Sequence, residues 1–131
     1  MHQIISTGYW IINQVGKELK EFGITEPQYN VLRTLIEADE QPLTVQAIQE
    51  KMIQKNSNVS RIIDKLLDKG LVGRKECPSN RRKVDIVITE SGKSLLKVLD
   101  KKILAFHHPM MQNLNEEELK TLTQLIIKFK S

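Results

Sequence analysis

The stretch "NSNVSRIIDKLLDKG" (residues 56–70) decides the fold of this chain. At 100° per residue its apolar side chains gather on one side, as a core-facing helix requires: Val59, Ile62, Ile63 and Leu66. The opposite side carries, in order, Ser57, Asn58, Arg61 and Lys65. Solvated helix faces are usually filled with Glu, Lys and Gln, which are better helix formers than Ser and Asn. The outer face of this helix is therefore chemically unusual.

Positive charge is concentrated around this stretch. Residues 51–83 hold ten Lys or Arg and three Asp or Glu, a net +7, whereas the other ninety-eight residues hold a net −3. Such segregation favours a surface that binds a polyanion, carried on a nearly neutral scaffold. From charge alone, chance clustering of solvated lysines is an equally good explanation.

The composition describes one soluble globular domain. The chain has 131 residues, of which 40% are hydrophobic and 27% charged, enough for a core without disulfides or metal. The single cysteine, Cys77, excludes an internal disulfide and is typical of a reducing compartment. No apolar run reaches the ~18 residues of a membrane span, and the N-terminus lacks a basic leader followed by an apolar stretch. We therefore expect a cytoplasmic protein that does not enter a membrane.

The rest of the chain predicts three helices before residues 56–70, then a hairpin and two more helices. Helices are expected to about Phe22, after Thr25 (with Gln28 as its capping-box partner) and after Thr44. Apolar residues alternate in "KVDIVIT" (83–89), and the turn formers of "PSNRR" (78–82) separate this run from "LVGRKEC" (71–77), which indicates a hairpin with a basic loop. Caps at Thr89 and at Asn115 begin the closing helices.

This order predicts a mainly α (α+β) fold, a winged helix-turn-helix with a two-stranded β wing. A helix that enters a major groove needs short hydrogen-bonding groups near base edges, where Asn pairs with adenine and Arg with guanine. Surrounding cations, Lys69 and Lys75 among them, would meet phosphates, and arginines on a slim turn fit a minor groove. The expected DNA-binding residues are Thr44, Lys55, Asn56, Ser57, Asn58, Ser60, Arg61, Lys65, Arg74, Arg81, Arg82 and Lys83.

Each of these features also has a plainer interpretation. Asn56, Ser57 and Asn58 can be no more than caps and turn residues at a helix start. A hairpin that ends in Arg81 and Arg82 is often only a solvated edge. The conjunction of cap, polar helix face, basic wing and charge segregation within about forty residues favours DNA binding over these separate explanations.

The chain resembles MarR-type transcriptional regulators over roughly residues 22–100. The matching motifs are "ITEPQYNVL" (24–32), Leu43-Thr44, Val59-Ser60-Arg61, "KGLV" (69–72), the Arg81-Arg82 pair, and Ile88-Thr89 followed by Ser91-Gly92. Two positions depart from the family pattern. Asn80 stands where the family commonly has Asp, which weakens a carboxylate contact at the wing, and Ile53 lies in a turn that often contains Gly.

The resemblance implies a homodimer that reads a palindromic double-stranded operator, acts as a repressor, and is released by a small aromatic effector. Residues 1–131 would form one domain, with a DNA-binding core at 25–89 and dimerisation helices at 1–22 and 90–131. The dimer would be held by apolar side chains of the terminal helices: Ile4, Trp10, Ile11, Leu114, Leu122 and Ile126. Packing of some of these side chains within one chain is the alternative.

Other functional classes are less well supported by the sequence. Cys77, His107 and His108 lack an orienting carboxylate or a glycine-rich elbow, so we expect no enzyme activity. His2, His107 and His108 lack metal-ligand spacing, so we expect neither a metal nor a cofactor. A redox-active Cys77 near Arg74 and Lys75 stays open. The main alternative function is a winged-helix protein-interaction module that does not read DNA.

Overall fold

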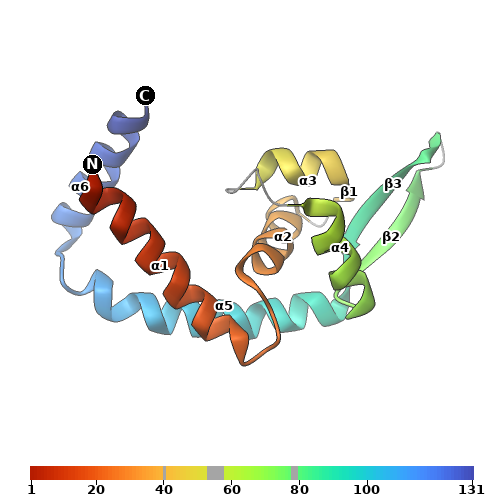
Figure 1. The fold of residues 1–131 in the computed structure, drawn as a ribbon, viewed down its shortest axis with the longest axis horizontal. Coiled ribbons are helices and arrows are strands. Elements are labelled where there is room, and N and C mark those ends of the chain that lie inside the picture. The colour runs from red at the N-terminus through yellow and green to blue at the C-terminus, as the bar shows by residue number, and fades with distance from the viewer. Residues whose placement is uncertain (40, 53–57, 78–79) are drawn as a thin grey trace. The chain divides into compact units, whose positions relative to one another are not determined.

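The computed structural model describes residues 1–39, 41–52, 58–77 and 80–131, with the backbone alone for 77 and 80–83. The chain forms two compact units, Met1–Leu99 and Asp100–Ser131. Six helices and three strands are present in the described residues (Figure 1). In chain order they are α1 (His2–Lys20), α2 (Glu26–Glu37), β1 (Leu43–Thr44), α3 (Val45–Lys51), α4 (Val59–Asp68), β2 (Val72–Cys77), β3 (Asn80–Ile88), α5 (Glu90–Met111) and α6 (Glu116–Lys130).

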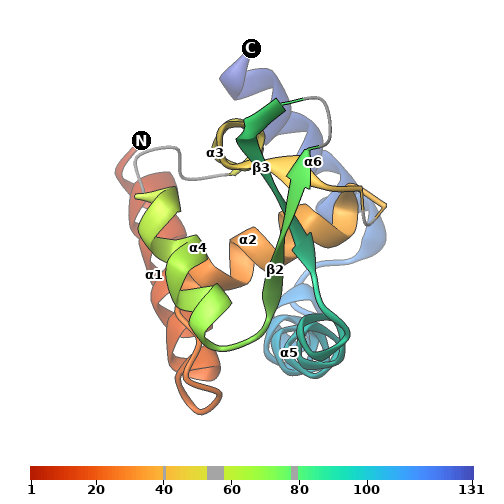
Figure 2. The same ribbon diagram turned by 90° about the vertical axis from the view of Figure 1, so that its right-hand side faces the viewer.

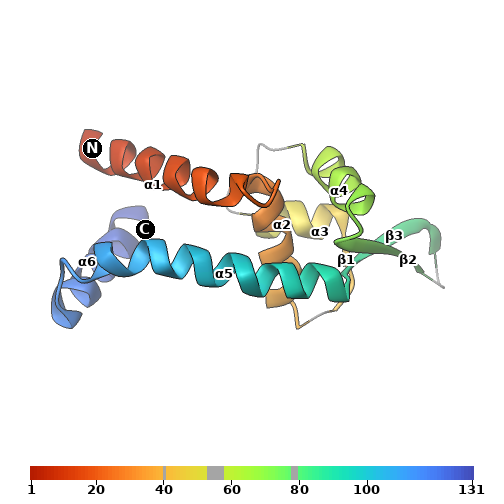
Figure 3. The ribbon, with the colours of Figure 1, turned by 90° about the horizontal axis from the view of Figure 1, so that it is seen from below.

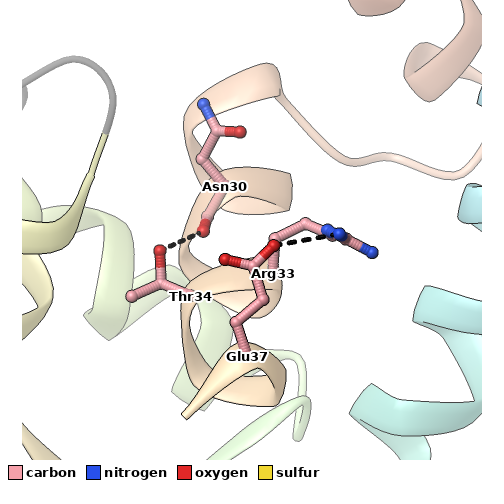
Figure 4. Close-up of polar contacts among 4 residues, drawn as sticks. All are labelled: Asn30, Arg33, Thr34 and Glu37. Carbon is pink, nitrogen blue, oxygen red and sulfur yellow. Dashed lines mark hydrogen bonds and ion pairs between the residues drawn. The ribbon is translucent and has the colours of Figure 1, made fainter.

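Local capping explains where α2 begins. The Thr25 hydroxyl accepts the backbone N–H of Gln28, and the Gln28 side chain accepts the backbone N–H of Thr25, which is the predicted capping box. Along the helix, Arg33 pairs with Glu37 at 2.9 Å, and the Thr34 hydroxyl donates to the Asn30 carbonyl at 2.8 Å (Figure 4). These local bonds leave the other side of α2 free to enter the core.

The predicted hairpin is confirmed, and a third strand joins it. β2 and β3 pair antiparallel, with Val72 opposite Ile88, and β1 pairs with the outer edge of β3, with Leu43 opposite Ile86. The order is β1-β3-β2. The sequence pattern does not predict β1, because two residues carry no measurable alternation.

The core of the first unit lies between α2, α4 and the sheet. The inward side of α4 is the predicted one, because Val59, Ile63 and Leu66 are all buried. Other buried side chains of this unit include Leu32, Leu35, Ile48, Ile86 and Leu99. Gly70 then ends α4 with φ +70°, as expected for a glycine just after a helix.

The second unit contains the end of α5 and all of α6. Asn115 is the predicted cap of α6, and it forms a capping box with Glu118. From the sequence, Leu119, Leu122, Leu125, Ile126 and Phe129 form a stripe that a core-facing helix would bury. This prediction is wrong, because no α6 side chain is buried in the described residues. Its apolar side chains remain exposed, among them Leu122, Leu125, Ile126 and Phe129. No helix in the described part of the chain combines the length and hydrophobicity that crossing a bilayer requires.

Candidate nucleic-acid interface

The outward face of α4 presents the polar residues that the sequence singles out. Ser60, Arg61 and Lys65 are exposed, while Val59 and Ile63 on the same turns are buried. Figure 2 shows α4 and the β2–β3 hairpin on the same side of the first unit. The arrangement therefore offers a polar helix surface with a β hairpin beside it, which is the geometry of a groove-reading module.

Asn58 is both exposed and the N-cap of α4. Its Oδ1 accepts the backbone N–H of Arg61 at 3.2 Å. The capping explanation for this residue is therefore confirmed, and the helix begins at Val59. Capping occupies the oxygen of the amide, and its NH₂ group keeps two donors for another partner. Structural and binding roles can thus coexist in Asn58.

The wing approaches α4 through an ion pair. The Arg74 guanidinium on β2 lies 3.3 Å from the Asp64 carboxylate on α4, and both side chains are mostly exposed. A shallow groove of about 320 Å³ lies beside this pair, with Ser60 and Asp64 on one side and Val84 and Ile86 in its lining. Exposed pairs contribute little to stability, and this contact places the Arg74 guanidinium beside α4.

The hairpin projects beyond α4 (Figure 1, Figure 3). β3 begins at Asn80, so Arg81, Arg82 and Lys83 lie at its start, near the far end of the hairpin, where Cys77 pairs with Asn80. The side chains of Cys77, Arg81, Arg82 and Lys83 are outside the described residues, as are Ile53, Lys55, Asn56 and Ser57. For these positions the sequence-based expectations stay predictions.

Thr44 has a clear structural role at the edge of this surface. It is the last residue of β1, and its hydroxyl accepts the backbone N–H of Ala47 at 3.1 Å as the N-cap of α3. The predicted cap is confirmed. A DNA contact by Thr44 would have to coexist with this bond.

Lys69, the C-cap of α4, is hydrogen-bonded to the turn before α2. Its ammonium donates to the backbone carbonyl of Gly23 and lies 3.4 Å from Oε1 of Gln28. The charged end of Lys69 is thus bound to the turn before α2, and a phosphate contact by Lys69 would have to compete with these bonds. Sequence reasoning missed this contact because its partners are 46 and 41 residues away.

The charge of the surface is arranged around the helix. On α4 itself, Arg61 and Lys65 are balanced by Asp64 and Asp68. The excess of positive charge comes from residues that flank the helix in sequence, such as Lys51, Arg74 and Lys75, which are exposed. Flanking cations are suited to phosphates, and a neutral polar helix is suited to base edges.

Comparison with known proteins identifies the family. The family model described as "MarR family" matches residues 24–84. The HTH-type transcriptional regulator MhqR of Bacillus subtilis is 31% identical over 124 residues, which cover 94% of this chain and 84% of MhqR. The chain belongs to the MarR family. Members of this family are transcription regulators, so the expectation that the chain is not an enzyme is confirmed.

Solved structures of MarR proteins have the same fold. A MarR-like regulator from Bacillus cereus superposes with a TM-score of 0.87 at 21% identity, covering 98% of this chain and 91% of that one. A MarR variant from E. coli, crystallised with operator DNA, has a TM-score of 0.85 at 22% identity, covering 98% and 91%. The winged helix-turn-helix prediction is thereby confirmed.

The predicted dimer residues of this MarR protein are largely uncovered. Ile4, Trp10, Leu122 and Ile126 are exposed by 43–52%, and Ile11 and Leu114 are partly exposed. In the second unit, a groove of about 610 Å³ is lined by Leu114, Leu122 and Leu125 together with polar side chains. Exposed apolar area of this kind is typical of interaction surfaces.

The histidines considered for catalysis or metal binding lie on helices of both units. His107 and His108 lie on α5, and the His108 ring nitrogen is 3.0 Å from the Gln112 amide. Among the described residues, no three His, Cys, Asp or Glu side chains converge as metal ligands would. Cys77 lies on β2, in the other unit.

Proposed function

We propose that this chain is a sequence-specific DNA-binding transcriptional regulator. The single observation that carries the proposal is the exposed face of α4, with Asn58, Ser60 and Arg61 outward beside the β2–β3 hairpin, in a chain of the MarR family. The MarR variant crystallised with operator DNA has the same fold. Such a protein would act in the cytoplasm.

The residues divide by chemistry into three groups. Asn56, Ser57, Asn58, Ser60 and Arg61 would face base edges in the major groove, because short amides, hydroxyls and a guanidinium pair with them. Thr44, Lys55, Lys65, Arg74 and Lys83 would contact phosphates and fix the register. Arg81 and Arg82 would enter a minor groove, where negative potential is concentrated.

The functional unit would be a homodimer. The core at 25–89 would read DNA, and the helices at 1–22 and 90–131 would pair with a second copy. Support comes from the apolar α6 face, on which Leu122 and Ile126 are exposed in one chain. A twofold dimer places its two recognition helices, the α4 helix of each chain, about 34 Å apart. This separation is one turn of DNA, so the dimer reads a palindrome.

Regulation would follow from the same geometry. A dimer on a promoter represses by blocking polymerase, and a small aromatic effector bound between the winged core and the dimer helices would change the spacing of the recognition helices. The effector can change the spacing only if it binds the two corresponding dimer conformations with different affinity.

Selection of bound duplexes from a random DNA pool, followed by a salt titration on the selected site, tests the proposal. A regulator with about six phosphate contacts gives a log–log slope of affinity against salt of around −5. A palindromic consensus with this slope supports DNA reading. Absent binding, or binding that does not respond to salt, would favour the protein-interaction module instead.

A further inference from the structure

The turn that follows the recognition helix is hydrogen-bonded on two sides. This turn, residues 69–71, joins α4 to β2. On one side, the Lys69 ammonium donates to the Gly23 carbonyl and approaches Oε1 of Gln28 at 3.4 Å. Gly23 and Gln28 belong to the turn and first helical residues between α1 and α2, so Lys69 connects α4 to the end of α1 across more than forty residues of sequence.

The second acceptor of Lys69, the Gln28 side chain, is buried and hydrogen-bonded. Gln28 is only 3% exposed, and its Oε1 also accepts the backbone N–H of Thr25 at 3.1 Å. The Gln28 backbone N–H in turn donates to the Thr25 hydroxyl at 3.3 Å. The lysine therefore binds a preorganised set of oxygens, and hydrogen bonds from a charged donor are stronger than neutral ones. A long surface lysine would otherwise sample many rotamers.

On the other side, the turn is fixed to the start of α5. The Thr89 hydroxyl donates to the Gly70 carbonyl at 2.7 Å and accepts the Gly92 backbone N–H at 3.1 Å. The Thr89 N–H donates to the Leu71 carbonyl at 3.1 Å. A Cβ at Gly92 would lie 2.1 Å from that same carbonyl oxygen, so only glycine permits this approach. The first turn of α5 is therefore in direct contact with the end of α4.

We propose that Lys69 is a positioning residue that fixes the orientation of the recognition helix relative to α1. This inference rests on the proposed function, in which α1 and α5 carry the dimer. The close backbone contact at Thr89 and Gly92 forms a fixed point, and the Lys69 contact stops α4 from rotating about that point. In the dimer, the two Lys69 contacts then set the spacing and angle at which the two α4 helices meet DNA.

The competing role for Lys69 is a phosphate contact, and the two roles predict different measurements. A lost phosphate contact weakens binding to all sequences and lowers the salt slope by about one. A lost positioning contact leaves the number of phosphate contacts unchanged. It instead lets the recognition helices accept half-sites at the wrong separation.

The first experiment compares Lys69→Met with Lys65→Met, which removes an exposed lysine from the same helix. The probes are the selected duplex and two derivatives whose central spacer is one base pair longer or shorter. We expect wild type and Lys65→Met to bind the derivatives roughly tenfold more weakly than the selected duplex, because one base pair rotates a half-site by about 36°. For Lys69→Met, the affinity for the selected duplex exceeds that for the derivatives by less than about threefold, while the salt slope stays unchanged. Lys69→Arg restores the tenfold preference for the selected duplex. A Lys69→Met protein with wild-type spacing preference and a lower slope would overturn the proposal.

The second experiment needs no DNA. Amide hydrogen exchange of the free protein is measured for the segments 22–28 and 66–72 in wild type, Lys69→Met, Lys69→Arg and Lys65→Met. We expect faster exchange in both segments for Lys69→Met alone, because the contact joins them. Unchanged exchange at 22–28 refutes the contact. If wild type binds no duplex, the proposed function fails, and exchange still decides whether Lys69 positions α4. If Lys69→Met does not fold, Lys69→Gln takes its place.

Discussion

The guanidinium of Arg74 lies 3.3 Å from the carboxylate of Asp64, so an ion pair joins β2 of the hairpin to α4, the proposed recognition helix. Asp64 is one of two acidic residues on α4, a helix proposed to approach a polyanion. A carboxylate at this place repels phosphate and also competes with it for Arg74. We infer that Asp64 limits binding to arbitrary DNA, where close base contacts do not compensate for this competition.

Asp64→Asn is therefore expected to raise the affinity for non-specific duplex DNA by about three- to tenfold, with a smaller gain on the selected operator. The ratio of operator affinity to non-specific affinity would therefore fall. Stability should change by less than ~1 kcal/mol, because the pair is exposed. Fluorescence anisotropy with both duplexes measures the ratio. Asp68→Asn is the matched control, since it removes the same charge from the same helix without releasing Arg74; an equal effect of both variants would refute a specific role for the Asp64–Arg74 pair.

Asn58 allows capping and base reading to be separated. Aspartate also caps helices and favours the positive end of the helix dipole, so Asn58→Asp should keep thermal stability within ~0.5 kcal/mol of wild type. The new carboxylate faces DNA and lacks the amide donors, so operator affinity should fall at least tenfold. Asn58→Ala removes the cap and should destabilise the fold by ~1 kcal/mol.

Thermal unfolding measures the stability of both Asn58 variants, and titration with the operator measures their affinity for DNA. If Asn58→Asp bound the operator as tightly as wild type, the residue would be a cap alone.

Local features of this fold were readable from the sequence. The capping boxes of Thr25 with Gln28 and of Asn115 with Glu118 need only a three-residue spacing, and both are present. The buried side of α4 follows from helical periodicity, and the burial of Ile86 and Ile88 follows from strand alternation. These signals lie within one element each, which is why they survive without knowledge of the tertiary structure.

Features that depend on distant partners were not readable. β1 exists because Leu43 meets Ile86 across forty-three residues, and Lys69 is held by residues of the α1–α2 turn. Nothing in the local pattern of either segment records its partner. The α6 helix shows the same limit, because its amphipathicity predicts an apolar face but does not tell whether that face is buried, and Ile126 is exposed.

Arg61 is expected to read a base. It lies on the exposed face of α4 in the turn next to the N-cap, so Arg61→Ala should weaken operator binding by ~1–3 kcal/mol and relax one base position in each half-site. Arg82→Ala should instead weaken binding more uniformly across sequences, as loss of a wing contact does. Repeating the selection from random DNA with each variant separates these outcomes. If both variants selected the same sequences as wild type and bound them with the same affinity, a different surface would contact the DNA.

The exposed apolar face of α6 is the proposed dimer interface. Ile126 is 43% exposed and lies on the same side of the helix as Leu122, so Ile126→Glu would place a charge in the proposed dimer interface. A buried unpaired carboxylate is costly, and we expect the dimer to dissociate at least a hundredfold more readily. Gln124→Glu adds a charge on the opposite side of α6 and should leave the dimer intact.

Sedimentation equilibrium of wild type and both α6 variants measures the dissociation constant directly. Tight binding to the full palindrome requires both recognition helices, so Ile126→Glu should lose affinity for it. Its affinity for a single half-site should equal the weak affinity of wild type. Since the change lies outside the proposed DNA-reading surface, equal losses on half-site and palindrome would point to misfolding instead, which circular dichroism would reveal. A wild-type protein that sediments as a monomer at every concentration would exclude the α6 interface altogether.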